Sequence, residues 1–381
     1  MSAAQGRRRL RVGIVGGGRG AFIGAVHRMA AELDGEAEVI AGALSSNPQT
    51  AASSAEAWYL RRSYDDYRVM AAQESALADG IDFVIVATPN HLHFPVANAF
   101  LEASIHVICD KPLAYSCEEA EALARRVLRG PELFALTHTY TGYPLVKEAR
   151  ERIRAGELGD IRKVLVEYNQ DWLMTPLERE GNRQAQWRTD PARAGLSCCV
   201  GDIGTHAAHL VEFITGSRIE AVAADLTTFV PGRALDDDAN MLLRLEHGAR
   251  GTLVCSQVAC GEENNLNIRV YGSKAALEWH QQEPNTLILK RAGAPWSLLR
   301  SAHAYLGDDA RLAARTPAGH PEGYVEAFAS LYRSFTADVR RVAAGDAPLL
   351  DYPTVEDGVR GLRFIEAAVR SSAGGARWEN V

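Results

Sequence analysis

The sequence has no long hydrophobic run and no block of charge of one sign. Its 381 residues include 41 basic and 48 acidic side chains, a formal net charge of −7, and the two signs are mixed along the chain. No apolar stretch approaches the roughly 20 residues that a transmembrane helix needs. Without a basic patch the chain lacks the surface that attracts nucleic acids or anionic membranes. We therefore expect no membrane or nucleic-acid partner, and a small neutral or weakly polar ligand instead.

Cysteine is also sparse. The six cysteines include the adjacent pair Cys198 and Cys199, but they lack the spacing of a disulfide framework or of a paired Cys-x-x-Cys zinc site. This usage fits a reducing cytoplasm. Export is the alternative, because Arg7, Arg8 and Arg9 precede an apolar run and could imitate a twin-arginine signal. We favour a cytoplasmic location, since that run also forms the first strand and glycine turn of a nucleotide-binding unit.

The first third of the chain alternates short apolar runs with helical patterns, which is typical of a parallel sheet with crossover helices. Predicted helices at 93–103 and 116–128 separate some of these runs, and the second begins with a serine cap and an acidic first turn. We therefore expect a dinucleotide-binding Rossmann domain, with a doubly wound parallel sheet, over residues 1–138. Its predicted strands are 10–16, 38–44, 82–88, 105–110 and 132–138.

Residues 139–381 have longer alternating stretches, which predict antiparallel strands with one covered face. The fold class is thus α/β plus α+β, with a C-terminal domain for substrate binding and oligomerisation, whose large, mostly antiparallel sheet is covered by helices on one face. Because the other face also needs cover, we expect a homodimer or homotetramer. Asp236 to Asp238 predict a solvated turn. The alternating stretches are 162–172, 219–230, 240–259 and 266–280, and the helical patterns are 144–155, 205–215, 321–344 and 354–371.

A glycine-rich stretch, GIVGGGRGAF, lies between the first predicted strand and a helix. It contains Gly16-x-Gly18-x-x-Ala21, a dinucleotide-binding fingerprint with alanine in the third place. Gly16 permits a tight turn, Gly18 lets the backbone approach a pyrophosphate, and the helix N-terminus offers N–H groups to that anion. The alternative is that the glycines only turn the chain. The cofactor-binding residues predicted in this stretch are Gly16, Gly18, Arg19, Gly20, Ala21 and Phe22.

The second predicted strand ends without the acidic residue that usually binds the ribose of NAD. Ser45 and Ser46 stand there, and serines can bond a ribose hydroxyl or tolerate a 2′-phosphate. No arginine follows the serines. We therefore predict NAD as the cofactor, with NADP possible.

Three further motifs follow the glycine loop: Thr-Pro-Asn-His-x-His at 88–93, acid-Lys-Pro at 110–112 and Gly-Asp-x-Gly-x-His at 201–206. In this order and approximate spacing the chain resembles the glucose-fructose oxidoreductase and inositol dehydrogenase (Gfo/Idh/MocA) family, from about Leu10 to the C-terminal helices. The family usually has glutamate where this chain has Asp110. The resemblance implies oxidation of inositols, sugars or glycosides, and it assigns catalysis to Lys111, Asp202 and His206.

The residues themselves support that chemistry. Lys111 follows a strand at the carboxyl edge of the predicted sheet, where its ammonium can polarise an alcohol or carbonyl oxygen, and Pro112 restricts it to an extended backbone. Asp202 and His206 are four residues apart, so they share one face if the segment is helical. His206 is suited to remove the hydroxyl proton, while Asp202 holds the substrate or the imidazole and offsets the charge of Lys111. The alternative for Lys111 is a surface lysine at a turn.

A metal site is the competing interpretation of the stretch 198–209, which contains Cys198, Cys199, Asp202, His206 and His209. Adjacent cysteines rarely reach one tetrahedral ion together, and hydride transfer with a lysine in place does not need a Lewis acid. We therefore predict no metal and a packing role for His209.

The remaining predicted site residues belong to the cofactor or to the substrate. Trp187 and Arg188 suit a polyhydroxylated ring or the cofactor, although a packed tryptophan with a surface arginine is equally compatible. The further cofactor-binding residues are Thr88, Pro89, Asn90, His93, Asp110 and Lys111. The predicted substrate-binding residues are Lys111, Tyr168, Asp171, Trp187, Arg188, Asp202, His206 and His320.

The leading functional hypothesis is an NAD(P)-dependent dehydrogenase that oxidises a secondary hydroxyl of a cyclic polyol, with His206 as general base. A second is a glycoside-cleaving enzyme that oxidises C3 transiently and returns the hydride. A third is a sensor that binds nucleotide without turnover. The presence of Lys111, Asp202 and His206 argues against the sensor.

Overall fold

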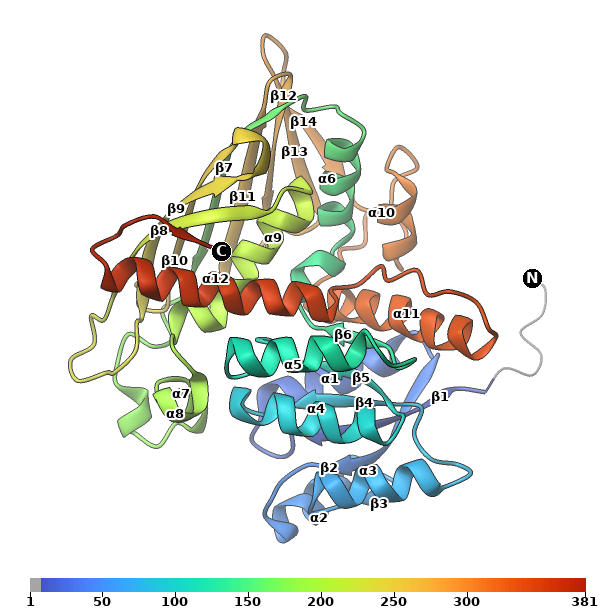
Figure 1. The fold of residues 1–381 in the computed structure, drawn as a ribbon. Coiled ribbons are helices and arrows are strands. Elements are labelled where there is room, and N and C mark those ends of the chain that lie inside the picture. Colours follow the sequence, from blue (N-terminus) through green and yellow to red (C-terminus); the bar gives the residue numbers. More distant parts are fainter. Residues whose placement is uncertain (1–7) are drawn as a thin grey trace. The chain divides into compact units, whose positions relative to one another are not determined.

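Two units make up the chain in the computed structural model, which describes residues 8–381 (Figure 1). The first runs to Thr137 and also contains Phe328–Gly358, and the second comprises His138–Ala327 and Val359–Val381. Two long helices, α11 (Tyr324–Ala343) and α12 (Val355–Ala373), therefore contribute residues to both units. Arg7, with which the export alternative begins, lies outside the described residues.

The first unit is built on a six-stranded sheet with the strand order β3-β2-β1-β4-β5-β6. All of its strand pairs are parallel, which confirms the predicted Rossmann fold. The strand order reverses between β1 and β4, and ligands of open α/β sheets bind outside the carboxyl ends of the strands at such a point. The strands are β1 (Leu10–Gly16), β2 (Ala37–Ala43), β3 (Arg62–Ser63), β4 (Phe83–Ala87), β5 (His106–Cys109) and β6 (Phe134–Leu136).

The crossover helices of this unit begin where their sequences place capping residues. Ser116 accepts a hydrogen bond from Glu119 N at the start of α5, as predicted, and Asn47 accepts one from Thr50 N at the start of α2. Such side-chain acceptors satisfy N–H groups that the first helical turn leaves without partners. The helices are α1 (Phe22–Leu33), α2 (Pro48–Ala57), α3 (Tyr67–Ala76), α4 (His93–Glu102) and α5 (Cys117–Val127).

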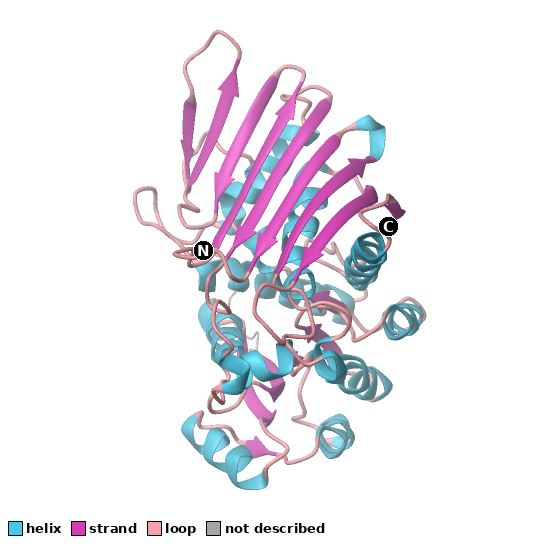
Figure 2. Ribbon diagram, turned by 90° about the vertical axis from the view of Figure 1, so that its left-hand side faces the viewer, coloured by secondary structure: helices cyan, strands magenta, loops and turns pink. Residues whose placement is uncertain are grey.

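The second unit contains a nine-stranded sheet with the order β14-β13-β12-β11-β7-β10-β9-β8-β15 (Figure 2). Only β10 and β7 pair in parallel, and the other neighbours are antiparallel, as predicted for the C-terminal domain. The strands are β7 (Ile161–Asn169), β8 (Ile219–Thr227), β9 (Asp238–Leu245), β10 (Arg250–Ser256), β11 (Asn265–Gly272), β12 (Ala275–His280), β13 (Thr286–Arg291), β14 (Ser297–Arg300) and β15 (Glu379–Asn380).

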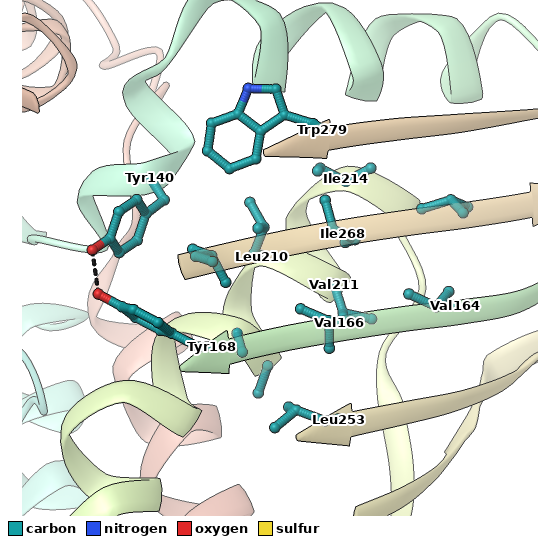
Figure 3. Packing of buried hydrophobic residues seen from close by; sticks show 14 of the residues in the cluster. Tyr140, Val164, Val166, Tyr168, Leu210, Val211, Ile214, Leu253, Ile268 and Trp279 are labelled. Carbon is teal, nitrogen blue, oxygen red and sulfur yellow. Dashed lines mark hydrogen bonds between the residues drawn. The ribbon is translucent and has the colours of Figure 1, made fainter. Parts of the chain in front are cut away.

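Helices α6 (Pro144–Arg154) and α9 (Thr205–Thr215) pack their apolar side chains onto one face of this sheet. Figure 3 shows Leu210 and Ile214 of α9 against Ile268 of β11, with Trp279 of β12 beside them. Along β9 the side chains alternate strictly between buried and exposed, which is the period of a strand with one covered face. The smaller helices of this unit are α7 (Arg183–Arg188), α8 (Pro191–Ala194) and α10 (Asp308–Ala313).

Within residues 8–381, no helix combines the length and the hydropathy required to cross a membrane.

Candidate active site

The glycine loop turns sharply between β1 and α1. Gly16 has φ +79° and Gly20 has φ +86°, a region of backbone conformation that residues with a Cβ rarely adopt. A Cβ on Gly16 would lie 2.6 Å from the carbonyl oxygen of Ala87 on β4, and one on Gly18 would lie 2.6 Å from that of Leu44. The loop therefore packs directly on the ends of the neighbouring strands, and larger residues at these two positions would push it away.

The start of α1 has features that suit an anion. Ala21, the N-cap residue, supplies no side-chain acceptor to the N–H groups of the first turn. Arg19, Gly20 and Phe22 are exposed around it, and Phe22 retains 68% of its accessible surface. Helix N-termini of this kind bind phosphate groups through their N–H groups and their dipole. All the predicted residues of the glycine loop are thus brought together at the β1–α1 turn.

The carboxyl end of β4 carries Thr88 beside the glycine loop. Its Cγ2 would lie 3.0 Å from a Cβ on Gly16, and its buried Oγ1 has no hydrogen-bond partner among the described residues. His93, at the start of α4, has its Nε2 2.8 Å from Thr88 O and its Nδ1 2.6 Å from Pro112 O, and a neutral ring donates its one N–H to one of these two carbonyls. Burial lowers the pKa of His93. His93 therefore ties the β4 turn to the loop after β5 rather than presenting a charged ring.

Asp110 and Lys111 follow β5, the next strand along the sheet. The Asp110 carboxylate accepts hydrogen bonds from Lys111 N at 2.9 Å and from Thr137 Oγ1 at 2.7 Å. Lys111 is half-buried, and the Lys111–Pro112 peptide bond is cis. The motif thus stands at the carboxyl edge of the parallel sheet, where the sequence predicted it.

Ser45 and Ser46 lie directly after β2, with Ser45 half-buried and Ser46 exposed. Ser45 Oγ accepts a hydrogen bond from Asn47 N at 3.1 Å, and Asn47 in turn caps α2. No arginine directly follows these serines in the sequence.

In the second unit, Asp202 and His206 do not lie on one continuous α-helix. Residues Val200–Gly204 form a π-helical turn, and His206 is the second residue of α9, which follows. A π turn inserts an extra residue relative to α-helical spacing, and such turns are frequent at functional sites. Both side chains are half-buried.

The prediction of a solvated turn at Asp236 to Asp238 is wrong. Asp236 is 7% exposed, and it accepts hydrogen bonds from Ser197 Oγ, Cys198 N and Val200 N at 2.9–3.0 Å. Burial raises the pKa of this carboxyl. Three consecutive acidic residues usually lie in solvent, which is why the sequence predicted a solvated turn. In the structure, the hydroxyl and the two backbone N–H groups take the place of water around Asp236. Asp236 thereby anchors the segment that leads into the π turn and so fixes the position of Asp202.

The carboxylate of Asp202 contacts Arg188 and Gln257 in the second unit. Arg188 Nε lies 3.1 Å from Asp202 Oδ2, and Gln257 Nε2 donates to the same oxygen at 2.9 Å. Gln257 Oε1 in turn accepts from the buried thiol of Cys198 at 3.4 Å, which fixes the orientation of the amide. The Arg188 guanidinium lies 4.1 Å from the ring centroid of Trp187, within reach of a cation–π contact. Arg188 therefore both stacks on Trp187 and forms an ion pair with Asp202.

His206 is surrounded by aromatic rings. Its ring centroid is 4.9 Å from that of Tyr140 and 6.3 Å from that of Tyr168, and its Nδ1 is 3.5 Å from Nδ1 of His138. His138 also stacks on His209, with centroids 4.1 Å apart and an interplanar angle of 11°. The packing role predicted for His209 thus has a partner, although that partner is a histidine next to the proposed base.

Tyr140 and Tyr168 share a short hydrogen bond between their hydroxyls (Figure 3). Asn264 completes the group, since its Oδ1 accepts from the Tyr168 hydroxyl at 2.8 Å and its Nδ2 lies 3.3 Å from the Tyr140 hydroxyl. Burial raises the pKa of both tyrosines, and the nearby charge of Asp202 adds to that effect. Both tyrosines therefore stay neutral and form hydrogen bonds next to His206. Tyr168 is only 3% exposed, so its hydroxyl bonds within this network rather than to solvent.

The other predicted substrate residues make their hydrogen bonds elsewhere. Asp171 Oδ2 accepts from Gly261 N at 3.2 Å, and Trp187 Nε1 donates to Gln184 Oε1 at 3.2 Å. His320 is exposed and bonds through Nδ1 to Pro317 O at 3.2 Å. Within the second unit the structure thus groups Tyr168, Arg188, Asp202 and His206, and Trp187 joins them through its ring, which lies under the Arg188 guanidinium. Asp171 and His320 instead contact Gly261 and Pro317.

Sequence reasoning missed four members of this group: His138, Tyr140, Gln257 and Asn264. His138 is the last residue of the predicted strand 132–138 and Tyr140 follows it, so their position at a strand end was the available signal. Gln257 and Asn264 carried no comparable motif.

Across residues 8–381, no three His, Cys, Asp or Glu side chains are grouped in a way that could hold a metal ion.

Comparison with known proteins places this geometry in context. Residues 10–138 match the family described as "Oxidoreductase family, NAD-binding Rossmann fold", and residues 146–278 match the "GFO/IDH/MocA C-terminal domain". The oxidoreductase YfiI of Bacillus subtilis, described as uncharacterised, is 33% identical over 377 residues, which cover 97% of this chain and 96% of that protein.

Two relatives have described ligands or substrates. The structure of an inositol dehydrogenase homolog from Azotobacter vinelandii with NAD⁺ has a TM-score of 0.94 and 38% identity and covers 98% of both chains. Its complex with NADH and myo-inositol has a TM-score of 0.92 and 37% identity, also over 98% of both chains. Levoglucosan dehydrogenase of Pseudarthrobacter phenanthrenivorans is 30% identical over 312 residues, 73% of this chain and 75% of that protein.

Proposed function

This chain belongs to the Gfo/Idh/MocA oxidoreductase family, and we propose that it is an NAD-dependent dehydrogenase that oxidises a secondary hydroxyl of a cyclic polyol. The observation that carries the proposal is the arrangement around His206, a histidine flanked by neutral tyrosines and preceded by the fixed carboxylate of Asp202. The relatives that bind myo-inositol with NADH or act on levoglucosan support an inositol, sugar or glycoside as the substrate class.

The residues of the first unit fit a dinucleotide. The uncapped N-terminus of α1 suits the pyrophosphate, and the buried Thr88 Oγ1, without a partner among the described residues, suits a polar group of the ligand. When bound, NAD supplies the nicotinamide ring that accepts a hydride. We assign binding of the cofactor to the glycine loop, Ser45, Ser46, the 88–93 turn and the Asp110–Lys111 pair.

Oxidation of a secondary alcohol removes a hydride from carbon and a proton from oxygen. We assign the proton to His206, because a neutral imidazole can accept it and then release it to water. Lys111 Nζ polarises the substrate oxygen and stabilises the charge that develops on it. The Asp202 carboxylate accepts hydrogen bonds from Arg188 and Gln257, and these contacts hold its negative charge next to the base.

The test is a panel of inositols, sugars and glycosides, including myo-inositol and levoglucosan, assayed for net NADH and NADPH. We expect NADH formation with at least one polyol. Lys111→Ala and His206→Ala should each lower kcat by roughly 10²-fold or more, the usual scale of general acid–base and electrostatic contributions. NAD binding, measured by calorimetry, should be unchanged in His206→Ala. In Lys111→Ala it should persist but weaken up to severalfold, because Lys111 contributes to the cofactor site while the glycine loop stays intact.

Two results would contradict the proposal. Substrate consumption without net NADH would indicate transient oxidation during glycoside cleavage. A His206→Ala protein with wild-type kcat and an unchanged pH profile would remove His206 from the chemistry.

A further inference from the structure

His138 and His206 face each other through the same ring nitrogen. The two Nδ1 atoms are 3.5 Å apart, and the rings meet edge to face, with an interplanar angle of 85°. His138 is 2% exposed and comes two residues after β6, while His206 lies in the first turn of α9. The stack with His209, one turn further along α9, holds the plane of the His138 ring.

This contact restricts the proton positions on both rings. A hydrogen bond between two ring nitrogens requires a proton on one and a lone pair on the other. If His206 Nδ1 were the acceptor, its Nε2 would carry the proton of the neutral ring and could not act as a base. If His206 Nδ1–H is the donor, Nε2 has the lone pair that accepts a proton.

We propose that His138 is a positioning residue for His206: His138 Nδ1 accepts the Nδ1–H of His206 and thereby keeps Nε2 of His206 as the basic nitrogen. The inference rests on the function proposed above. When His206 takes the substrate proton it becomes an imidazolium, and the hydrogen bond from its Nδ1–H to the neutral His138 strengthens. The pair therefore holds one additional proton readily and resists a second, because two imidazolium rings would place N–H groups and like charges against each other.

The other groups around His206 do not perform this role. Tyr140 and Tyr168 face its ring, but burial raises the pKa of both, so they stay neutral over the working range of a histidine. Asp202 precedes it on the π turn, with its charge paired to Arg188. His209 contacts His138 by stacking and is 8% exposed. Within the second unit, Nδ1 of His138 lies within hydrogen-bonding distance of Nδ1 of His206.

Two substitutions test the acceptor nitrogen of His138 and its aromatic ring independently. His138→Phe keeps an aromatic ring that can stack on His209 but removes the acceptor. His138→Asn loses the ring but keeps an amide oxygen that can accept near the position of Nδ1. His303→Phe is the matched control, since His303 also stacks on a ring, that of Tyr305 at 4.9 Å, on the segment after β14. Thermal melting establishes that each variant is folded.

We expect His138→Phe to lower kcat about tenfold, with KM for the polyol and the affinity for NAD within about twofold of wild type. The midpoint of its pH–rate profile should move to lower pH by about half a unit or more, because the imidazolium of His206 loses an acceptor. His138→Asn should recover most of kcat, and His303→Phe should match wild type. A rise in KM with unchanged kcat would overturn the proposal, and so would loss of activity in His138→Asn equal to that in His138→Phe.

The tautomer can be measured without turnover. In protein labelled with ¹⁵N-histidine, the ring nitrogen shifts of His206, assigned with His206→Ala, should report a proton on Nδ1 at high pH and a change of tautomer mixture in His138→Phe. Should no polyol be oxidised, this result would still support the role of His138 while the proposed function fails. A proton on Nε2 of His206 in the wild type at high pH, or identical spectra in the two proteins, would overturn the inference.

Discussion

Arg188 Nε contacts Asp202 Oδ2 at 3.1 Å, so the carboxylate that precedes His206 is one half of an ion pair. Its two side chains are 21% and 15% exposed, so the pair is half-buried and only partly screened by solvent. The guanidinium also lies over Trp187, which limits its rotation. The negative charge of Asp202 therefore has a cationic partner inside the second unit.

Replacing Arg188 with lysine tests the importance of that geometry. Lysine retains the charge but lacks the planar donors and the stacking surface of the guanidinium. We expect Arg188→Lys to lower kcat about tenfold, while NAD affinity, which depends on the first unit, stays unchanged. The control is Arg183→Lys, an exposed arginine at the other end of α7. Equal kcat in both variants and the wild type would show that a positive charge alone suffices at position 188.

The choice of cofactor depends on the end of β2. No arginine follows Ser45 and Ser46, so the protein should bind NAD at least as well as NADP. Ser45→Asp should add a ribose acceptor and repel a 2′-phosphate, which favours NAD further by about 1 to 3 kcal/mol. Calorimetric titration with both nucleotides measures this, with Ser75→Asp on α3 as the control. A wild type that prefers NADP tenfold or more would contradict the prediction.

Local patterns predicted most of the elements that build the candidate site. The strand at 10–16, the serine cap at Ser116 and the helix at 205–215 all correspond to observed elements, because each depends on neighbours within a few residues. Strands β13 and β14 were not predicted, since each is a short apolar run that resembles many loops.

The partners of the catalytic candidates required the tertiary structure. Gln257 reaches Asp202 across 55 positions and His138 reaches His206 across 68, and no periodicity links such residues. Asp236 was misread for a related reason. Acidic residues are usually solvated, and only the fold brings the donors that allow this one to be buried.

The first unit contains buried histidines, and we expect them to lower the free energy of unfolding in mild acid. Burial lowers the pKa of both His27 and His93 in the folded state. As the pH drops below the unfolded value of about 6.5, the unfolded chain binds protons that the folded protein does not. Each histidine then removes up to about 1.4 kcal/mol of unfolding free energy per pH unit, until the pH reaches its folded pKa.

Urea unfolding at pH 7.5 and 5.5 measures this loss. In His27→Asn, which removes the ionisable ring that bonds to the Tyr332 hydroxyl at 2.7 Å, the protein should be less stable at pH 7.5 but lose less stability between the two pH values. An equal loss in variant and wild type would contradict the assignment of part of the effect to His27.

The exposed face of the nine-stranded sheet predicts self-association. Along β9, Met241 and Leu243 point into the core while Leu242 is 55% exposed on the opposite face. An apolar residue in the middle of a sheet face gains free energy when a second surface covers it. We expect a homodimer or homotetramer that uses this face, and light scattering at micromolar concentration should return a multiple of the 41.4 kDa chain mass.

Leu242→Arg should shift that assembly toward smaller species, because association would bury an unpaired charge. Leu312→Arg on α10 is the matched control: Leu312 is 71% exposed, so arginine there adds the same charge outside the sheet. Circular dichroism establishes that both variants are folded. A wild-type monomer would refute self-association itself, whereas an oligomer unaffected by Leu242→Arg would place the interface on another surface. Dissociation by both variants alike would attribute the effect to net charge rather than to the sheet.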